Sequence, residues 1–322
     1  MSNMTKSLAV FSGSTYPEFA EEVARCLGVE LGKVQLEKFA NGEIYARYLE
    51  TVRGADVFIV QSVSGPNVNE SLMELLIMID AAKRASARTV HAVVTHYAYA
   101  RQDRKAAARE PITAKLVANL MTTAGIDSII TMDLHQGQIQ GFFDVPVNHL
   151  SALWQLAEHI KTKDLDTDNM VVVSPDLGRA KAAKKMSNLI GCDMAILHKE
   201  RPKHNQAEVT ALIGDVSGKD CILNDDMIDT GGSVVAAVKT LKAKGANRVY
   251  VTCTHPVFSG SAYERLNDPD IEEVIVTNTI PVDKERAGKV HVISVAPLFA
   301  RAIQNVFGNT SISEMFDPNF AL

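Results

Sequence analysis

The sequence predicts an α/β protein of two successive units, each a mostly parallel sheet flanked by helices. Short apolar runs alternate with amphipathic helical segments along the chain, which is the pattern of repeated strand–helix–strand units. This alternation starts again after Pro146, and 322 residues are enough for two domains of ordinary size. We therefore expect an N-terminal domain over residues 1–148 and a C-terminal domain over residues 149–322, with the tail 311–322 able to pack elsewhere.

The first half of the chain contains four apolar segments that are typical of strands. A helix is expected from about Pro17 to just before Gly28, because proline suits the first turn of a helix and glycine its end. The asparagine–glycine pair at 41–42 favours a hairpin turn between two short strands. The remaining elements are strands at Ser7–Phe11, Asp56–Gln61, Thr89–Thr95 and Ser128–Leu134, and helices at Asn69–Ala85 and Pro111–Thr123.

The second half repeats the same kind of alternation. Its helices are expected at Ala180–Leu189, Ser259–Leu266 and Pro297–Phe307. The run Lys199–Asn205 is polar and interrupted by proline, so it predicts a loop that moves. The strands are expected at Met170–Ser174, Met194–Leu197, Val209–Ile213, Arg248–Thr254 and Glu273–Thr277.

The stretch Cys221–Val234 has the features of a phosphate-binding turn. A buried strand precedes Asp229–Ser233 (DTGGS), and a helical pattern follows it. The two glycines allow close backbone approach, and Thr230 and Ser233 can either cap the helix or donate hydroxyls to a ligand. Several N–H groups would then point at one spot, where the helix dipole favours an anion.

Two aspartates, Asp225 and Asp226, precede this turn and suit sugar hydroxyls, which donate hydrogen bonds to carboxylates. The pattern is neither G-x-x-x-x-G-K-[ST] nor G-x-G-x-x-G, so it matches neither of the two common nucleotide loops. The alternative interpretation is an ordinary connection between a strand and a helix with a capping turn.

A basic and aromatic cluster lies in Tyr97–Lys105, directly after the strand Thr89–Thr95. In a parallel sheet this is the carboxyl edge, where ligands bind. The same residue types could grip single-stranded nucleic acid, or form a solvated loop without a role. The net charge of −5 gives no overall cationic field, so we expect no nucleic acid among the partners.

Composition favours a globular cytoplasmic protein that does not enter a membrane. Apolar residues make up 46% of the chain and charged residues 22%. The most apolar stretch, Ser71–Ala82, is interrupted by Glu74 and Asp80, and no segment has the pattern of a signal peptide. The four cysteines lack C-x-x-C spacing, and Cys221 and Cys253 lie in apolar runs, as reduced core residues do.

The motifs together resemble one family. The stretch Asn224–Ser233 (NDDMIDTGGS) is similar to the 5-phosphoribosyl-diphosphate loop of the type I phosphoribosyltransferase fold. With the other motifs, the chain resembles the class I ribose-phosphate diphosphokinases, or phosphoribosyl-diphosphate synthetases, whose fold is two tandem phosphoribosyltransferase-type I domains. The other motifs fall in the family's order: Arg53–Asp56, Tyr99–Asp103, Asp133–His135, Gln138–Asp144 and Lys199–Pro202.

The resemblance implies an enzyme that transfers the β,γ-diphosphoryl group of ATP to the 1-hydroxyl of ribose 5-phosphate, giving AMP. Lys199 and Arg201 match the catalytic pair of the flexible loop, and His135 and Asp176 match positions assigned to Mg²⁺. The resemblance also implies a homo-oligomer, a hexamer in the family, because the adenine-binding hairpin is often contributed across a subunit boundary. Residues matching the ATP site are Phe39, Asn41, Gly42, Glu43, Arg101 and Gln102, and those matching the ribose 5-phosphate site are Arg201, Asp225, Asp229, Thr230, Gly231, Gly232 and Ser233.

Chemistry supports part of these assignments. Transfer of a phosphoryl-type group needs positioning and charge stabilisation more than covalent catalysis, and mobile cations such as Lys199 and Arg201 supply that charge. Mg²⁺ prefers oxygen ligands, so a histidine ligand at His135 rests on the resemblance alone. Three positions depart from the family pattern, namely Arg179 for a glycine, Asn148 for an aspartate, and Glu200 within the cationic loop.

Two alternatives remain at this point. A phosphoribosyltransferase would share the phosphate turn, but it would leave residues 1–148 without a purpose. A non-catalytic regulatory paralogue, which would bind an active synthetase, is suggested by Arg179 and Asn148 and opposed by the presence of Lys199 and Arg201.

Overall fold

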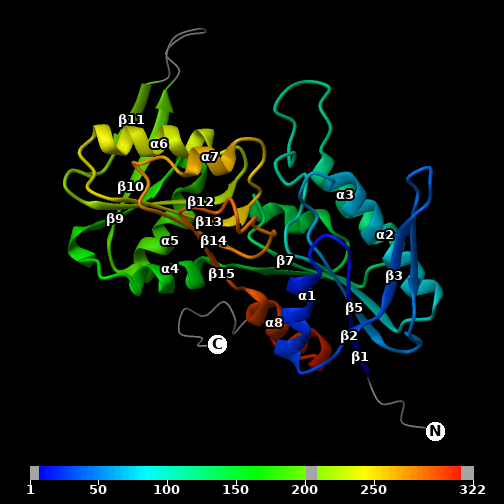
Figure 1. Ribbon diagram of the computed structural model, residues 1–322. Helices are drawn as coiled ribbons and strands as arrows, with labels where there is room; N and C mark the ends of the chain where they lie inside the picture. Colours follow the sequence, from blue (N-terminus) through cyan, green and yellow to red (C-terminus); the bar gives the residue numbers. More distant parts are fainter. Residues whose placement is uncertain (1–6, 201–208, 313–322) are drawn as a thin grey trace. The chain divides into compact units, whose positions relative to one another are not determined.

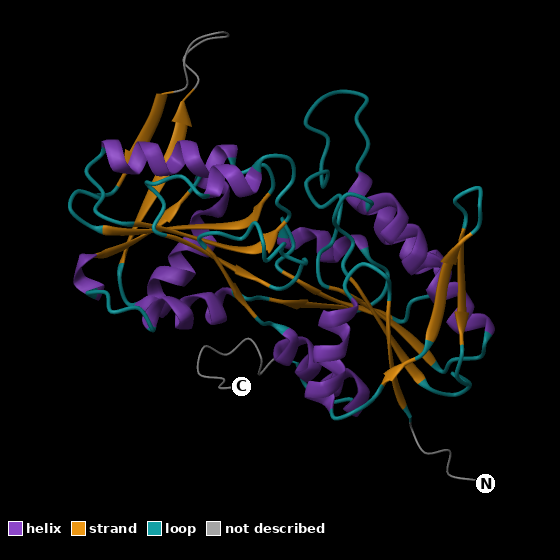
Figure 2. Ribbon diagram, viewed as in Figure 1, coloured by secondary structure: helices purple, strands orange, loops and turns teal. Residues whose placement is uncertain are grey.

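The computed structural model describes residues 7–200 and 209–312, and it divides the chain into two compact units (Figure 1). The first unit contains Met1–Ser151 together with the C-terminal segment that begins at Val295. The second unit contains Ala152–Ser294. Both units are sheets with helices packed against them, as the sequence predicts (Figure 2).

The first unit is built on a six-stranded sheet in which every neighbouring pair of strands is parallel. All six residues of the strand Asp56–Gln61 are buried, as expected for a central parallel strand with both faces covered. The order across the sheet is β2 (Leu31–Gly32), β1 (Leu8–Ser12), β5 (Asp56–Gln61), β6 (Thr89–Val94), β7 (Ser128–Met132) and β8 (Val147–Leu150).

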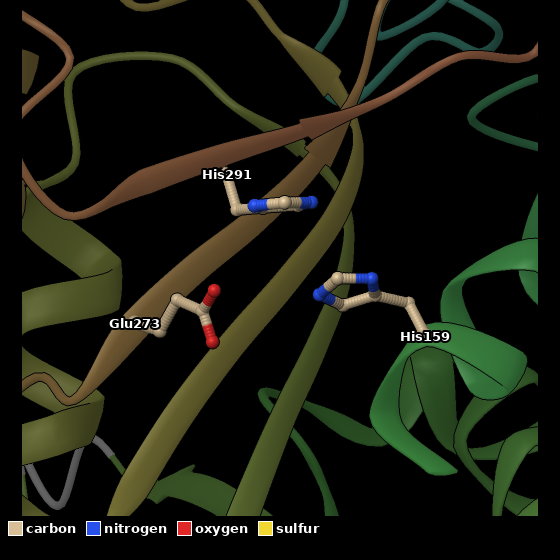
Figure 3. Close-up of side chains that lie close together, drawn as sticks. All are labelled: His159, Glu273 and His291. Atoms are coloured by element: carbon tan, nitrogen blue, oxygen red, sulfur yellow. The ribbon is translucent and has the colours of Figure 1, made fainter. Parts of the chain in front are cut away.

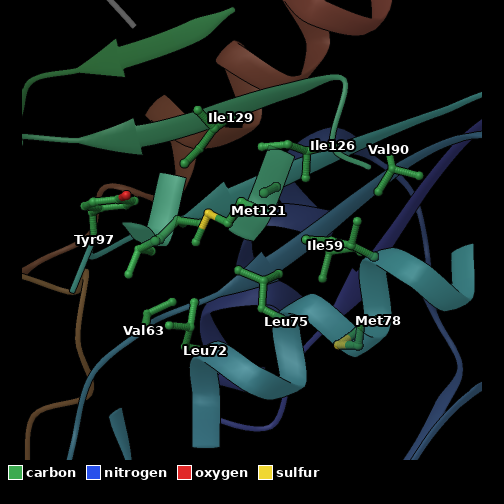
Figure 4. Close-up of a cluster of buried hydrophobic side chains, with 14 of the residues drawn as sticks. Ile59, Val63, Leu72, Leu75, Met78, Val90, Tyr97, Met121, Ile126 and Ile129 are labelled. Carbon is green, nitrogen blue, oxygen red and sulfur yellow. The ribbon is translucent and has the colours of Figure 1, made fainter. Parts of the chain in front are cut away.

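Helices α2 (Val68–Arg84) and α3 (Thr113–Ala124) cover one face of this sheet. Their apolar stripes meet alternate residues of the strands in a continuous core, in which Leu75, Met121 and Ile129 are fully buried (Figure 4). Helices α1 (Pro17–Leu27) and α8 (Ala296–Gly308) contact each other on the unit's other side.

Helix α8 corrects the expected domain division. Phe299 packs edge-to-face against Phe19 of α1, with the ring centroids 5.5 Å apart. The C-terminal helix therefore belongs to the first unit, whereas residues 149–322 were expected in the second domain, with only the tail 311–322 able to pack elsewhere. The motif order could not reveal this, because the return of a terminal helix depends on contacts between residues far apart in the chain.

A two-stranded antiparallel hairpin projects from the first unit, formed by β3 (Val34–Lys38) and β4 (Ile44–Tyr48). Its turn is closed by backbone hydrogen bonds from Phe39 N to Glu43 O and from Gly42 N to Phe39 O. Gly42 has a φ of +90°, which favours glycine, so the asparagine–glycine pair forms the predicted turn.

The second unit is built on a seven-stranded sheet that is parallel except for the edge strand β11. The strand β12 is central, and its neighbours β9 and β13 run parallel to it. The order is β11 (Val209–Ile213), β10 (Asp193–Glu200), β9 (Met170–Ser174), β12 (Asp220–Ile228), β13 (Val249–Pro256), β14 (Glu273–Thr277) and β15 (Val290–Ile293).

Helices cover both faces of this sheet (Figure 1). Helices α6 (Gly232–Ala243) and α7 (Ala262–Leu266) pack on one face, over a core that includes the buried thiols of Cys221 and Cys253. Helices α4 (Leu153–Lys161) and α5 (Ala180–Ile190) pack on the other. The remaining elements are short 3-10 helices: η1 (Gly137–Phe142), η2 (Thr167–Asn169) and η3 (Leu177–Arg179).

The two units share a buried ion pair at equivalent places. In the first, Asp56 at the start of β5 accepts a hydrogen bond of 2.8 Å from Arg88 Nε, just before β6. In the second, Asp220 at the start of β12 accepts bonds of 3.0 Å and 2.6 Å from Nε and Nη2 of Arg248, just before β13. Both carboxylates are almost fully buried, so the guanidinium compensates a charge that would otherwise be costly.

Two local expectations from the sequence were wrong. Lys199 and Glu200 end the strand β10 and pair with β11, so the expected loop is a strand at its beginning. Strand β7 ends at Met132 and not at Leu134 as expected, so Asp133 and His135 lie in the loop that follows. Within residues 7–200 and 209–312, no helix is long and apolar enough to cross a bilayer.

Candidate active site

The candidate site of the second unit begins on β12 itself. Asp225 and Asp226 are part of the strand and continue its parallel pairing, rather than lying in the turn after it. Asp226 is buried while Asp225 is partly exposed, and the Oδ1 atoms of both lie 3.7 Å from one nitrogen of Arg179. Both lie close to the carboxyl end of a central parallel strand, the position where α/β sheets bind ligands.

The turn after β12 is fixed to the neighbouring loop. Ser259 N donates to Asp229 O at 2.9 Å, and Phe258 N donates to Ile228 O at 3.0 Å. Gly231 adopts a φ of +74°, which reverses the chain sharply and lets helix α6 begin at Gly232.

The start of α6 is uncapped, contrary to one of the roles considered for Thr230 and Ser233. Its N-cap residue is Gly231, and no side chain makes a capping hydrogen bond there. The first N–H groups of a helix have no partner within the helix, so here they need a ligand or water. With the helix dipole, these N–H groups are suited to binding an anion.

Arg265 of α7 adds a positive charge beside this turn. Its Nη1 donates a 2.9 Å hydrogen bond to Thr230 O. The same atom would lie 3.5 Å from a Cβ built on Gly232, so the guanidinium borders the uncapped helix start. Arg265 was not among the predicted site residues, because a single arginine on a five-residue helix carries no motif.

Arg179, which replaces a glycine of the family pattern, pairs with the two aspartates. Its Nε lies 3.7 Å from Oδ1 of Asp225 and 3.7 Å from Oδ1 of Asp226. That nitrogen is buried and has no hydrogen-bond partner among the described residues. The guanidinium therefore compensates the two carboxylates through charge rather than through a formed hydrogen bond.

The pKa of Asp225 is raised well above its usual value. Burial is the largest cause, followed by the neighbouring Asp226 carboxylate, while Arg179 opposes the shift. The side chain keeps 25% of its surface exposed, so a ligand can reach it. A carboxyl group at this position can accept a hydrogen bond from a hydroxyl, and its charge depends on Arg179.

Asp176 lies at the end of β9 in the same unit and is exposed. Its Oδ1 accepts a 3.0 Å hydrogen bond from Arg179 N, and no described residue donates to its Oδ2. An exposed carboxylate oxygen is a ligand that Mg²⁺ prefers, so Asp176 fits the predicted metal. The imidazole of His135 does not fit this preference, and it belongs to the first unit.

Of the two cations predicted for catalysis, only Lys199 lies within the described residues. Lys199 lies on β10, where its backbone pairs with Thr210 of β11. Arg201 lies outside the described residues.

The residues predicted for nucleotide binding are all in the first unit. Phe39 at the tip of the β3–β4 hairpin is 56% exposed, which is unusual for a phenylalanine and suits stacking on a ring. Asn41, Gly42 and Glu43 are also exposed, and Asn41 Oδ1 accepts a 3.2 Å bond from Glu43 N. These residues therefore present one exposed surface.

Arg101 and Gln102 lie together in the loop before α3, and both are exposed. Gln102 is held at both ends, because its backbone N donates to Tyr99 O at 2.9 Å and its Oε1 accepts from Thr113 Oγ1 at 2.5 Å. Tyr99 has a φ of +62°, an uncommon angle for a residue with a side chain.

Comparison with known proteins identifies the family. The N-terminal domain of ribose phosphate pyrophosphokinase matches residues 8–125, and the phosphoribosyl synthetase-associated domain matches residues 205–317. The ribose-phosphate pyrophosphokinase of Clostridium acetobutylicum is 50% identical over 317 residues, which are 98% of this chain and 99% of that protein. The corresponding protein of Wolinella succinogenes is 50% identical over 307 residues, covering 95% of this chain and 98% of the relative.

A solved structure agrees with these relatives. The crystal structure of phosphoribosylpyrophosphate synthetase from Mycobacterium smegmatis matches with a TM-score of 0.90 and 46% identity, covering 94% of this chain and all of that one. Both the matched domains and the full-length relatives agree with the family that the motifs predict. The chain therefore belongs to the ribose-phosphate pyrophosphokinase family.

Proposed function

We propose that this protein transfers the β,γ-diphosphoryl group of ATP to the 1-hydroxyl of ribose 5-phosphate, giving 5-phosphoribosyl diphosphate and AMP. The observation that carries the proposal is the uncapped start of α6, which follows the partly exposed Asp225 on the same strand–turn–helix segment. One end of this segment suits a phosphate and the other suits sugar hydroxyls, which are the two ends of a sugar phosphate. Family membership supports the same reaction.

We assign the ribose 5-phosphate to this segment of the second unit. The 5-phosphate would accept hydrogen bonds from the N–H groups and hydroxyls of Thr230–Ser233, with Arg265 adding positive charge nearby. Asp225 would accept a hydrogen bond from a ribose hydroxyl, and Asp229 would hold the turn through its backbone bond to Ser259. The sugar would thereby be fixed with its 1-hydroxyl away from the phosphate.

ATP would bind through the residues of the first unit. Phe39 would stack on the adenine ring, while Asn41, Gly42 and Glu43 would contact its edge through backbone and side-chain groups. Arg101 would neutralise phosphate charge, and Gln102, held by Tyr99 and Thr113, would position the nucleotide.

The chemical step needs an in-line approach of the sugar oxygen to the β-phosphorus of ATP. The bond from C1–O to this phosphorus forms, the bond between the phosphorus and the oxygen bridging to the α-phosphate breaks, and AMP leaves. Lys199 and Arg201 would stabilise the negative charge that develops on the transferred group and on AMP. The hydroxyl proton passes to a base or to solvent.

The cofactor is Mg²⁺, which neutralises the charge of the triphosphate when it is bound. Asp176 would hold it through the oxygen that no described residue bonds. His135 is the second proposed Mg²⁺ ligand, because it matches a position that the family uses for metal binding. The enzyme is cytoplasmic and homo-oligomeric in this proposal, because an adenine hairpin provided by a neighbouring subunit would leave a monomer incomplete.

A coupled assay tests the function directly. Full-length protein with ATP, ribose 5-phosphate and Mg²⁺, and without any nucleobase, should release AMP in an amount equal to the 5-phosphoribosyl diphosphate formed. A phosphoribosyltransferase would release no AMP under these conditions, and such a result would overturn the proposal.

A non-catalytic regulatory paralogue is the second candidate, and one observation favours it. Arg179 places a cation against Asp225 and Asp226, where the family pattern has glycine, and it could weaken sugar binding. The AMP-release assay separates the two candidates. A regulatory paralogue alone would release no AMP, but it would bind an active synthetase.

A further inference from the structure

Three side chains able to bind a metal ion meet at one edge of the second unit's sheet. His159 comes from α4, Glu273 from the start of β14, and His291 from the edge strand β15 (Figure 3). One ligand atom of each lies within 4.8 Å of the others. None of these residues has a role in the proposed reaction.

The register of the sheet and the turn of the helix bring them together. His291 pairs with Ile275 on the adjacent parallel strand, and Glu273 lies two residues before Ile275, so the two side chains leave the same face. Helix α4 covers this face, with Leu156 and Ile160 in the apolar core. His159 lies beside that core, so the polar cluster forms the rim of an apolar contact.

Within the cluster, His159 has a ring nitrogen whose hydrogen bonding is not satisfied by the described residues. Its Nε2 is buried and has no hydrogen-bond partner among the described residues. A buried polar atom without a partner is costly, and such an atom calls for a water molecule or an ion. Burial is the largest cause of a lowered pKa at His159, followed by the neighbouring His291 and Lys163.

We propose that His159, Glu273 and His291 bind a divalent transition-metal ion such as Zn²⁺, with water completing its coordination. Two imidazoles and one carboxylate are a donor set suited to Zn²⁺, Co²⁺ or Ni²⁺. Mg²⁺ and Ca²⁺ prefer oxygen ligands alone, so these three residues would not bind the Mg²⁺ that the reaction uses. The site is thus separate in residues and in metal preference from Asp176.

The ion requires two adjustments of the side chains. A tetrahedral zinc site has ligand atoms about 3.4 Å apart, so the three groups must close on the ion by about an ångström. The imidazoles are stacked, with centroids 4.3 Å apart and an angle of 25° between the rings, and they would turn to direct a nitrogen at the metal. All three groups are side chains, so the sheet does not need to move.

Lys163 would compete with the metal ion for the carboxylate of Glu273. Its Nζ lies 2.7 Å from Oε2 and 3.0 Å from Oε1 of Glu273, so it occupies the carboxylate that the metal would use. Lys163, Glu273 and His291 all line an open pocket of about 500 Å³, through which an ion can enter and the lysine can turn away. Metal binding would replace the ion pair between Lys163 and Glu273 by a metal-mediated link between α4 and the strands β14 and β15.

A zinc titration of the full-length protein tests the proposal. The protein is stripped with a chelator, returned to millimolar Mg²⁺, and titrated with Zn²⁺ against a competing dye. We expect His291→Gln and Glu273→Gln to bind one Zn²⁺ fewer than the unmodified protein and to lose its zinc-dependent rise in melting temperature. Glu272→Gln is the matched control, since Glu272 lines the same pocket outside the cluster, and it should keep both.

The competing lysine gives a prediction in the opposite direction. Lys163→Met should tighten zinc binding by about two- to fivefold, the factor expected for removing a partly exposed ion pair. Lys161→Met, which loses a pair with Glu158 on the same helix, should leave zinc binding unchanged. The titration is repeated with Cys26→Ser, because that exposed thiol could also hold zinc. Equal zinc stoichiometry in the unmodified protein, His291→Gln and Glu273→Gln would overturn the proposal, and so would weaker binding by Lys163→Met.

Discussion

Replacing Arg179 with alanine should destabilise the second unit, because two carboxylates would lose the cation beside them. Arg179 Nε lies 3.7 Å from Oδ1 of Asp225 and of Asp226, and only 2% of the Asp226 side chain is exposed. At an effective dielectric constant of about 20, each such pair of charges attracts by about 4.5 kcal/mol before the cost of desolvation. Removing one partner of a buried pair costs about 3–5 kcal/mol, and the partial exposure of Asp225 favours the lower end. We therefore expect a loss of about 3 kcal/mol in unfolding free energy at pH 8.

The loss should depend on pH with a defined sign. Burial and Asp226 raise the pKa of Asp225 in the folded protein, and removing Arg179 raises it further. A carboxyl with a raised pKa stabilises the fold when protonated, fully so below its unfolded pKa of about 3.9. That contribution is lost as the pH rises through the folded pKa. The deficit of Arg179→Ala should accordingly be smaller at pH 5 than at pH 8.

Urea unfolding at the two pH values measures this deficit. The single tryptophan, Trp154, lies on α4 of the second unit, so its fluorescence reports on the right unit. Arg179→Lys should recover part of the stability because it restores a cation. Lys181→Ala removes an exposed cation two residues away and should cost less than about 0.5 kcal/mol. The reasoning is refuted if Arg179→Ala behaves like Lys181→Ala, or if its deficit is the same at pH 5 and pH 8.

Three further predictions concern catalysis, ATP binding and stability. Lys199→Ala should lower kcat by at least about 100-fold with little change in KM, because one preorganised charge in the transition state is lost; equal losses in substrate binding would argue against this role. Phe39→Ala should raise the KM for ATP about tenfold, the effect of losing one stacked ring, without changing Tm. Leu49→Ala, which removes a similarly exposed apolar side chain, is its control and should leave the KM unchanged. Burial alone would raise the pKa of Asp220, but the hydrogen bonds and charge of Arg248 hold this pKa below its usual value. The ion pair between Asp220 and Arg248 therefore stabilises the fold above about pH 4 and less below it. Asp220→Asn should therefore cost about 2 kcal/mol at pH 7 and less at pH 3, measured by urea unfolding; a constant cost would contradict the assignment.

Local pattern predicted most of the fold. The strand Asp56–Gln61 and the hairpin turn at residues 41–42 follow from short apolar runs and turn residues, and the structure contains both. The strand, turn and helix over Cys221–Val234 were predicted for the same reason, because they are contiguous in the chain, and the structure contains them; that the turn binds a phosphate stays a prediction. The return of α8 to the first unit was missed, since only the contact of Phe299 with Phe19 reveals it.

The geometry of the candidate site was predictable where its residues are neighbours in sequence and not where they come from different elements. Arg179 was noticed as a departure from the family pattern, but its pairing with Asp225 and Asp226 depends on how β9 and β12 lie side by side. Arg265 meets Thr230 across 35 positions of the chain. The cluster of His159, Glu273 and His291 joins one helix and two strands, and none of the three lies in a motif.

A crystal structure with bound ribose 5-phosphate tests the central claim most directly. We predict that the 5-phosphate accepts hydrogen bonds from the N–H groups of Gly231, Gly232 and Ser233, and that Asp225 accepts one from a ribose hydroxyl. A structure in which the sugar phosphate lies elsewhere, with water alone at the start of α6, would contradict the account.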